Sequence, residues 1–265
     1  MIPAVLSIAG SDSSGGAGIQ ADIKTIIAHG LYAETAITAV TAQNTQGVFG
    51  VVECDPKFVS LQVKTVFDDI RPNAVKVGMV GSSGIVNAIA ESLVEAQATN
   101  IVLDPVMVAS SGSVLMADEA VDALVEKLLP LADIVTPNIP EAVVLAQHAI
   151  SNEEDMATAA RKIQEAMGGE GKWVLMKGGH LENAADDLLL TEHGREVWLR
   201  HKHIDTPNTH GAGCTLSSAI ACGLARDFDM QSAVSKAKTY ITGALEHDPG
   251  LGRGSGPIDH MWETR

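Results

Sequence analysis

The stretch THGAGCTLSSAI, residues 209–220, sets two glycines directly before an apolar helical pattern. Gly211 and Gly213 let backbone N–H groups converge on an anion at the positive end of that helix. The first polar side chain inside the helix is the thiol of Cys214. A carboxylate is the usual general base for a hydroxyl at neutral pH, so a thiol at this position requires an explanation. The stretch predicts a phosphate-binding loop with Cys214 beside the phosphate.

Four further residues carry groups that suit a phosphate or a metal ion. Asn138 and Glu141 lie three residues apart in TPNIPE, where they can hold hydrated Mg²⁺ or instead form a helix capping box. Asp104 is at the end of a predicted strand, before Pro105, where it can be a second acid on the metal side or simply start a turn. Lys177 precedes two glycines and can neutralise a phosphate or lie in solvent. These residues alone leave each pair of alternatives open.

Two other kinds of site have weaker support. Cys214 can be a covalent nucleophile, because a helix N-terminus lowers the pKa of a thiol, but the chain has no nucleophile-elbow motif. His201 and His203 point to one face of a predicted strand without a third zinc ligand nearby in sequence. Cys54 and Cys222 fit small hydrophobic side chains of the core.

Short apolar runs that alternate with helical patterns must position these residues. Such alternation predicts an α/β fold, with a mostly parallel sheet covered by helices on both faces. The predicted strands are 4–9, 35–40, 74–78, 100–104, 133–137 and 172–177, and the predicted helices are 19–30, 56–70, 82–98, 117–129, 152–167, 214–225 and 229–246. An antiparallel hairpin over 188–204 follows, turned at His193 and Gly194. No linker or internal repeat divides the chain, so we expect one domain over residues 1–265.

Glycine-rich and polar segments follow each of these strands. They are GSDSSGGAG, TAQNT, MVGSSG, PVMVASSG, NIPE and GGH. The first is neither a Walker A loop nor a dinucleotide-binding GxGxxG motif. Because ligands of open α/β sheets bind beyond the carboxyl ends of the strands, the segments predict a single site along that edge.

The composition disfavours several classes of partner. A formal charge of −15 and a pI near 4.9 argue against nucleic acids and anionic membrane surfaces, which are bound through clustered Lys and Arg. No apolar run approaches the roughly 20 residues of a membrane span. Three cysteines without a CxxC pair fit a reducing compartment, and the apolar N-terminal segment fits a first strand better than a signal peptide. We therefore expect a cytoplasmic protein that acts on a small molecule.

Seven segments, in their order and context, resemble the hydroxymethylpyrimidine/phosphomethylpyrimidine kinases of thiamine biosynthesis, which are members of the ribokinase-like superfamily. The segments are AGSDSSGGAGIQADIKT, TAQNTQGV, KVGM, LDPVMVASSG, TPNIPEA, LMKGGH and NTHGAGCTLSSAI. GAGC is specific to the family, since most ribokinase-like sugar kinases have GAGD with Asp as the base. The resemblance implies a ribokinase-like three-layer αβα fold and the use of ATP and Mg²⁺. We also expect a homodimer.

The resemblance also implies roles for residues of this chain. Gln43 matches the residue that reads the edge of the pyrimidine. The wall of the pyrimidine pocket is matched by Gly10, Asp12, Ala17, Met79 and Val106. Asn138 and Glu141 match the Mg²⁺ and phosphate side with Asp104 close by, and Lys177 matches the contact with the nucleotide phosphates. The anion hole at the transferred phosphoryl group is matched by Thr209, Gly211, Gly213 and Cys214.

The implied reaction is the ATP-dependent phosphorylation of 4-amino-5-hydroxymethyl-2-methylpyrimidine to its monophosphate and then to its diphosphate. A pyridoxal kinase is the closest alternative, because some relatives with GAGC phosphorylate pyridoxal. Some of those have a second cysteine in the flap where this chain has Ala109, and many relatives have a lysine at the place of Ser110. A sensor without catalytic activity is a third alternative. It would not require the metal and phosphoryl residues Asn138, Glu141, Lys177 and Cys214.

Overall fold

The strands of the chain pair into one sheet whose carboxyl edge carries the segments singled out above. The computed structural model describes residues 2–108, 116–178, 186–200 and 204–264. The strands are β1 (Ala4–Asp12), β2 (Tyr32–Asn44), β3 (Gly47–Glu53), β4 (Ala74–Val77), β5 (Ile101–Leu103), β6 (Ile134–Val135), β7 (Trp173–Met176), β8 (Asp187–Leu190) and β9 (Glu196–Leu199). Over the described ranges their order in the sheet is β3-β2-β1-β4-β5-β6-β7-β8-β9.

Neighbouring strands from β2 through β1 and β4 to β7 all run parallel. Strand β3 is antiparallel to β2, β8 is antiparallel to β7, and β9 is antiparallel to β8. Parallel strands end at the same edge of a sheet, so the segments after β1, β4, β5, β6 and β7 meet there. The predicted mostly parallel sheet is confirmed.

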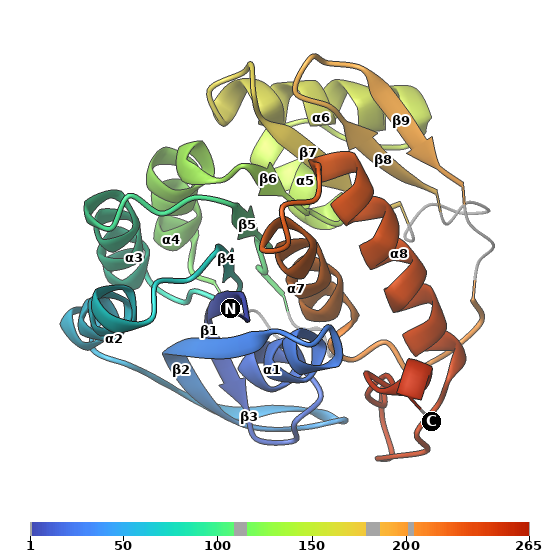
Figure 1. Cartoon of the computed structure of the whole chain (residues 1–265). Coiled ribbons are helices and arrows are strands. Elements are labelled where there is room, and N and C mark those ends of the chain that lie inside the picture. Colours follow the sequence, from blue (N-terminus) through green and yellow to red (C-terminus); the bar gives the residue numbers. More distant parts are fainter. Residues whose placement is uncertain (1, 109–115, 179–185, 201–203, 265) are drawn as a thin grey trace.

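Helices cover both faces of the sheet and give three layers (Figure 1). They are α1 (Gly18–Ala28), α2 (Pro56–Asp69), α3 (Ser83–Glu95), α4 (Asp118–Ala123), α5 (Ile139–Ala146), α6 (Glu153–Ala166), α7 (Ala212–Leu224) and α8 (Met230–Glu246). Helices α1, α7 and α8 pack on one face, and α2 to α6 pack on the other. The predicted αβα architecture is therefore confirmed.

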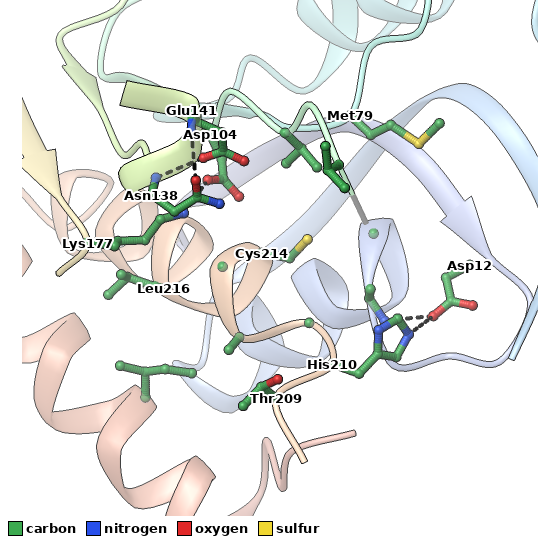
Figure 2. Close-up of a pocket in the computed structure, with 18 of the residues that line it drawn as sticks. Asp12, Met79, Asp104, Asn138, Glu141, Lys177, Thr209, His210, Cys214 and Leu216 are labelled. Carbon is green, nitrogen blue, oxygen red and sulfur yellow. Dashed lines mark hydrogen bonds and ion pairs between the residues drawn. The ribbon is translucent and has the colours of Figure 1, made fainter. Parts of the chain in front are cut away.

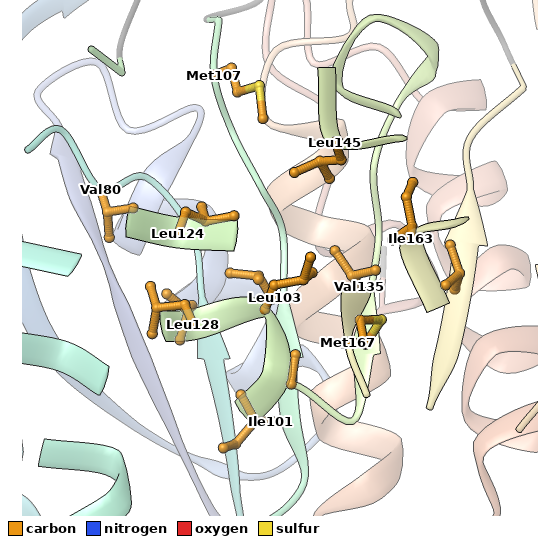
Figure 3. Close-up of a cluster of buried hydrophobic side chains, with 14 of the residues drawn as sticks. Val80, Ile101, Leu103, Met107, Leu124, Leu128, Val135, Leu145, Ile163 and Met167 are labelled. Atoms are coloured by element: carbon orange, nitrogen blue, oxygen red, sulfur yellow. The ribbon is translucent and has the colours of Figure 1, made fainter. Parts of the chain in front are cut away.

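Strand residues alternate between two hydrophobic cores because successive side chains of a strand point to opposite faces. Val5 of β1 packs in the core beneath α1, α7 and α8, whereas its neighbour Leu6 packs in the core beneath α2 to α6. Figure 3 shows the second core, where Leu103 and Val135 of the sheet meet Ile163 of α6. These buried side chains fix the strands whose ends form the site.

Strand β2 is longer than the predicted strand 35–40, and the sequence analysis missed β3. Val40 of β2 lies opposite Val52 of β3 in an antiparallel pair. The valines and Phe49 of β3 are strand-forming residues, but Gly50 interrupts the run and most residues of β3 are exposed, so the strand lacks the buried or alternating pattern of the other strands. As a result Gln43, expected in a loop, lies within a strand.

Other local predictions have mixed outcomes. The hairpin of β8 and β9 is confirmed, with Gly194 at a φ of +72° in its turn. The predicted helix 117–129 begins as α4 and continues as a π-helical turn over Leu124–Leu128. The flap positions 109 and 110 and the two histidines at 201 and 203 lie outside the described residues. Within the described ranges, no helix is both long and apolar enough to span a membrane.

Candidate active site

A cavity of about 730 Å³ lies at the carboxyl edge of the parallel strands (Figure 2). Every residue to which the sequence analysis assigned a role lines it: Gly10, Asp12, Ala17, Gln43, Met79, Asp104, Val106, Asn138, Glu141, Lys177, Thr209, Gly211, Gly213 and Cys214. Figure 2 shows Lys177, Asp104 and Glu141 gathered on one side of the cavity. Asp12 lies on the opposite side, and Cys214 lies between the two groups.

The loop that leads into α7 has a backbone geometry that requires glycine at position 211. Gly211 has a φ of +83°, and a Cβ there would lie 1.9 Å from the carbonyl oxygen of Gly16. A Cβ on Gly213 would lie 3.4 Å from both Asp104 Oδ2 and Lys177 Nζ. No side chain caps α7, and the first N–H groups of a helix have no acceptor within the helix. The start of α7 therefore fits an anion, as the sequence predicts.

The thiol of Cys214 is partly buried at the start of α7. Its sulfur accepts a hydrogen bond from the backbone N–H of Gly18. Burial raises the pKa of the thiol to about 11, although Lys76 acts in the opposite direction. Cys214 is therefore protonated at neutral pH. This argues against the covalent nucleophile, which depends on a lowered thiol pKa.

The side chain of Lys177 is paired and mostly buried, so the alternative of a solvated lysine is wrong. Its Nζ lies 3.0 Å from Asp104 Oδ1, and only 19% of the side chain is exposed. The Asp104 carboxylate, which is buried, also accepts a hydrogen bond from Thr136 Oγ1 at 3.0 Å. Although burial lowers the pKa of Lys177, the carboxylates of Asp104 and Glu141 raise it above its ordinary value. The lysine is thus a fixed cation in the cavity wall.

Asn138 and Glu141 form the capping box that was one of the two alternatives. Asn138 Oδ1 accepts from the N–H of Glu141 at 2.9 Å, and Glu141 Oε2 accepts from the N–H of Asn138 at 2.8 Å. Burial raises the pKa of Glu141, Lys177 lowers it and Asp104 raises it, with a net rise. The box fixes the start of α5 and holds the buried carboxyl group of Glu141 in the cavity wall next to Asp104.

Gln43 is held by contacts at both its side chain and its backbone. Its Oε1 accepts a hydrogen bond from Thr41 Oγ1 at 3.0 Å. Its backbone N–H donates to Ser13 Oγ, which donates in turn to the carbonyl of Gln43, both at 2.9 Å. Because Thr41 holds Oε1 of Gln43, the orientation of the whole side-chain amide is fixed. Its nitrogen can then donate a hydrogen bond to the polar edge of a heterocycle.

The opposite wall depends on close contacts that leave no room for side chains. A Cβ on Gly10 would lie 2.8 Å from Met79 Sδ, and a Cβ on Gly18 would lie 2.2 Å from the carbonyl oxygen of Gly10. Thr38 Oγ1 donates to the carbonyl of Met79 at 2.7 Å and so fixes the segment after β4. Gly10 and Met79 are therefore in contact with each other and form one surface of the cavity, against which a flat ring can pack.

The sequence analysis missed His210, which joins the first and last loops of the site. Its Nε2 lies 2.8 Å from Asp12 Oδ2, and both side chains are buried. Asp12 also accepts from the backbone N–H groups of Ser14, Gly16 and Ala17. Although burial raises the pKa of Asp12, the hydrogen bonds from His210, Ser14 and Ala17 hold it well below its usual value. The sequence did contain a signal for this contact, because His210 directly precedes the predicted phosphate-binding loop.

A buried ion pair near Cys214 was missed as well. Lys76 Nζ lies 2.8 Å from Asp22 Oδ2, and neither side chain is exposed. The signal was present in the run AVKVG, because a lysine in the middle of a buried strand must have a partner.

The cavity has a second, more apolar part between α7 and α8, and this part was not predicted. Its wall includes Ile204, Leu216, Ile241 and Leu245. Lys238 also lines the cavity, with Nζ 2.6 Å from Asp187 Oδ2.

The glycine-rich segment 250–257 packs against two loops of the site. The N–H groups of Arg253 and Gly254 donate to Thr45 Oγ1 at 3.1 and 3.2 Å. The carbonyl of Gly256 accepts from the N–H of His210 at 3.1 Å. A Cβ on Gly254 would lie 2.0 Å from the carbonyl oxygen of Thr45. This segment therefore connects Thr45, after β2, with His210, before α7.

Comparisons with known proteins agree with this geometry. The family model described as phosphomethylpyrimidine kinase matches residues 12–259. A curated relative named hydroxymethylpyrimidine/phosphomethylpyrimidine kinase, from Streptomyces coelicolor, is 46% identical over 260 residues, which cover 98% of this chain and 95% of the relative.

Two solved structures are also similar. The phosphomethylpyrimidine kinase of Clostridium difficile is 44% identical with a TM-score of 0.80, and the match covers 92% of this chain and 99% of that one. An ADP complex of Bacillus subtilis pyridoxal kinase is 36% identical with a TM-score of 0.89, and the match covers 98% of each chain. The chain therefore belongs to the phosphomethylpyrimidine kinase family of ribokinase-like kinases.

Proposed function

We propose that the protein phosphorylates 4-amino-5-hydroxymethyl-2-methylpyrimidine with ATP, first to the monophosphate and then to the diphosphate, in thiamine biosynthesis. The observation that carries the proposal is the position of Cys214 and the start of α7 between the Gly10–Met79 wall and the group of Lys177, Asp104 and Glu141. A pyrimidine alcohol on the side of Gly10 and Met79 and a nucleotide triphosphate on the side of Lys177 would meet at this helix end. The names of relatives at 43–46% identity support the pyrimidine over pyridoxal.

We place the nucleotide in the apolar part of the cavity. Leu216, Ile241 and Leu245 offer a surface for an adenine ring, since an aromatic base is stabilised by burial against aliphatic side chains. Lys177 then lies where it can neutralise the phosphates, with the N–H groups of Gly213 and Cys214 nearby.

Asp104 and Glu141 fit Mg²⁺ bound mainly through phosphate and water. No group of three or more His, Cys, Asp or Glu side chains that could hold a metal occurs among the residues the structure describes. Two buried carboxyl groups beside the single ammonium of Lys177 leave a negative balance that suits a cation. Mg²⁺ commonly uses one or two carboxylates and otherwise waters and phosphates. When bound, it would spread the charge of the transferred group.

The residues of the chain act chiefly by position in this proposal. Gln43 and the wall around Met79 hold the ring so that its CH₂OH oxygen faces the γ-phosphorus in line with the leaving oxygen. The amides at the start of α7 stabilise the equatorial oxygens. Phosphoryl transfer has a loose transition state with little bond formation to the attacking oxygen, so a strong base adds less than this amide cradle. A protonated thiol at Cys214 is compatible with such a reaction.

We further propose that residues 1–265 form one kinase domain, that the protein is cytoplasmic and that it forms a homodimer. Support for the dimer comes from the exposed apolar side chains of the edge of the sheet. Val40 of β2 is 51% exposed, and Phe49 and Val52 of β3 are 71% and 72% exposed. Exposed apolar edge strands are normally covered, because they otherwise promote aggregation.

The test is a coupled assay of ADP release with hydroxymethylpyrimidine, its monophosphate and pyridoxal as separate acceptors. The proposal expects turnover of the first two with a kcat/KM well above that for pyridoxal. A higher value for pyridoxal would identify the alternative kinase. Tight binding of a pyrimidine without any ADP release would identify a sensor.

A further inference from the structure

The hydroxyl of Thr215, near the start of α7, contacts a histidine from the far end of the chain. Thr215 Oγ1 lies 3.0 Å from Nε2 of His260, which is 45 residues further along, and both side chains are buried. The preceding residues of the same helix turn, Gly213 and Cys214, line the cavity. The contact between Thr215 and His260 therefore lies directly behind the wall that is expected to bind the phosphoryl group.

Thr215 also marks the point at which the internal hydrogen bonds of α7 begin. Its N–H donates to the carbonyl of Gly211 at 2.9 Å. The N–H groups of Gly213 and Cys214 precede this bond, so they have no acceptor within the helix and can bind an anion. A Cβ on Gly213 would lie 3.4 Å from Lys177 Nζ, so this turn packs closely against the fixed cation of the site. A small movement of Thr215 would change the position of both amides relative to that cation.

The hydroxyl of Thr215 makes a different bond from that of its neighbour Ser217. Serine and threonine inside a helix commonly donate to a carbonyl three or four residues earlier. Ser217 does so, with Oγ 2.9 Å from the carbonyl oxygen of Gly213 and 3.1 Å from that of Cys214. The hydroxyl of Thr215 instead connects α7 to the C-terminal segment.

His260 is the acceptor in this hydrogen bond. Burial lowers the pKa of its ring to about 4, so the ring is neutral at pH 7. The ring also forms a hydrogen bond with the backbone of Ile258. Because Nε2 faces Thr215, the bond to Ile258 belongs to Nδ1, which donates its hydrogen to the carbonyl. Nε2 then carries no hydrogen and accepts from the hydroxyl of Thr215.

Helix α8 fixes the backbone on both sides of His260. The carbonyl of His260 accepts from Tyr240 Oη at 2.6 Å. The N–H of Asp259 donates to the carbonyl of Ala244 at 3.2 Å, and Nε1 of Trp262 donates to the carbonyl of Tyr240 at 3.1 Å. The histidine is thus held on α8 while its side chain holds the start of α7.

We propose that His260 is a positioning residue that, through Thr215, fixes the N–H groups of Gly213 and Cys214 against the transferred phosphoryl group. This inference rests on the proposed function, which places the phosphoryl group at those amides. Stabilisation of a transition state by amides depends on donors that are already in place, and small errors of position reduce it strongly. The contact of His260 with Thr215 supplies this fixed position from behind the cavity.

The contact should act on the rate of transfer rather than on binding of the ring. Gln43 lies on β2 and Met79 follows β4, so the wall that holds the ring comes from other elements than α7. An interaction made mainly in the transition state lowers kcat when it is lost, whereas loss of uniform binding raises KM. A split between kcat and KM therefore separates positioning of the amides from a general disturbance of the cavity.

The first test removes only the hydroxyl. Thr215→Val has nearly the same shape as threonine and should lower kcat for the pyrimidine alcohol at least about tenfold, with the KM for that alcohol nearly unchanged. Thr215→Ser keeps the hydroxyl and should retain most of the rate. Ser217→Ala is the matched control, because it removes a hydroxyl whose bonds stay within α7. A loss confined to KM, or equal losses in all three variants, would overturn the proposal.

The second test changes the acceptor. The side-chain amide of glutamine extends to about the place of Nε2, whereas that of asparagine extends only to about the place of Nδ1. His260→Gln should therefore keep most of kcat, and His260→Asn should lose as much as Thr215→Val. The double variant of Thr215→Val and His260→Asn should be no slower than either single variant, because both remove the same contact. Equal losses in His260→Gln and His260→Asn, or additive losses in the double variant, would contradict the proposal.

A third measurement needs no substrate. Hydrogen exchange of the Thr215 amide in the free protein, followed by NMR, should be at least about tenfold faster in His260→Asn than in the wild type, because the first turn of α7 opens more readily. His260→Gln should exchange at nearly the wild-type rate. Unchanged exchange in folded His260→Asn would refute the positioning role while leaving the proposed function intact. A protein that prefers pyridoxal would refute the proposed substrate while leaving the exchange result intact.

Discussion

His210 Nε2 lies 2.8 Å from Asp12 Oδ2, and this contact joins two loops that are 198 residues apart in the chain. One loop forms the wall of the ring pocket, and the other leads into the anion-binding end of α7. Asp12 Oδ2 also accepts from the N–H groups of Gly16 and Ala17. The Asp12 carboxylate therefore accepts hydrogen bonds from the protein itself. Its role in the pocket wall is to hold the loop after β1 in shape.

The first prediction concerns Asp12→Asn, whose amide cannot accept all of these hydrogen bonds. Leaving buried donors without an acceptor should lower the free energy of unfolding at pH 7 by about 2–4 kcal/mol. The pKa of Asp12 is lowered in the folded state, so its stabilisation is present above the unfolded value of about 3.9 and is lost as the pH falls through the folded value. Urea unfolding should therefore show a smaller difference between wild type and variant at pH 3 than at pH 7. A constant difference would refute the role of the charge.

The second prediction concerns the metal. Glu141→Gln removes a charge but keeps an oxygen that can complete the capping box with Asn138. We expect the Mg²⁺ concentration for half-maximal rate to rise about tenfold or more, with partial recovery at excess Mg²⁺. Titration of the rate with Mg²⁺ at fixed ATP measures this. Superimposable curves for wild type and variant would exclude a metal role for Glu141.

The third prediction concerns recognition of the ring. Gln43→Ala should raise the KM for the pyrimidine by about tenfold or more while leaving the KM for ATP nearly unchanged, because an unmatched polar edge of the ring is costly to bury. Thr41→Val removes the hydroxyl that orients Gln43 Oε1 and should give a smaller rise in the same direction. Initial rates with each substrate varied in turn decide the matter. Equal rises for both substrates would remove Gln43 from the ring pocket.

The fourth prediction explains the cysteine. The phosphate oxygen that attacks in the second step is already anionic, so no base is required there. A carboxylate at position 214 would repel it by roughly 4 kcal/mol at 4 Å and an effective dielectric constant near 20. Cys214→Asp should therefore retain much of the alcohol phosphorylation and lose the second step disproportionately, whereas Cys214→Ser should keep both at reduced rates. Separate initial rates with purified alcohol and monophosphate measure the two steps, and equal losses in Cys214→Asp would show that charge is not the reason for the thiol.

The fifth prediction concerns the edge of the sheet. Val52→Lys places a charge on the exposed edge strand β3, opposite Val40. Sedimentation equilibrium should show a dimer for the wild type and a shift to monomer for the variant, because an interface cannot bury an unpaired ammonium without a large cost. Val94→Lys is the matched control, since Val94 on α3 is 60% exposed but lies away from this edge. A wild-type monomer, or an unchanged dimer in Val52→Lys, would rule out this interface.

Much of the fold could be predicted from local patterns. Buried strands such as the run from Ala4 stand out as short apolar segments, and amphipathic helices such as α6 have a helical side-chain period that follows from backbone geometry. Strand β3 could not be predicted in this way because its side chains contact solvent on both faces and its position depends on pairing with β2. Short-range sequence does not encode such pairing.

The same distinction holds for the site. The glycines before α7 and the Asn138–Glu141 spacing were visible because their geometry is local. The contact of His210 with Asp12 and that of Lys76 with Asp22 span 198 and 54 residues, so they depend on the packing of whole elements. A charged residue inside an apolar run can still reveal such a contact, because it must have a buried partner. Lys76 in AVKVG is the example in this chain.

The contacts of segment 250–257 have a consequence for biosynthesis. Arg253 and Gly254 bind Thr45, and Gly256 binds His210, so the loops on both sides of the cavity take their final positions only against this segment. Chains are made from the N-terminus, and the central strands can pair while the rest is still being translated. A ribosome-bound chain that has not yet released residues 250–257 would therefore have most of the sheet but no finished binding site. Catalytic competence therefore requires that residues 250–257 have been made, by which time most of the sheet can already have formed.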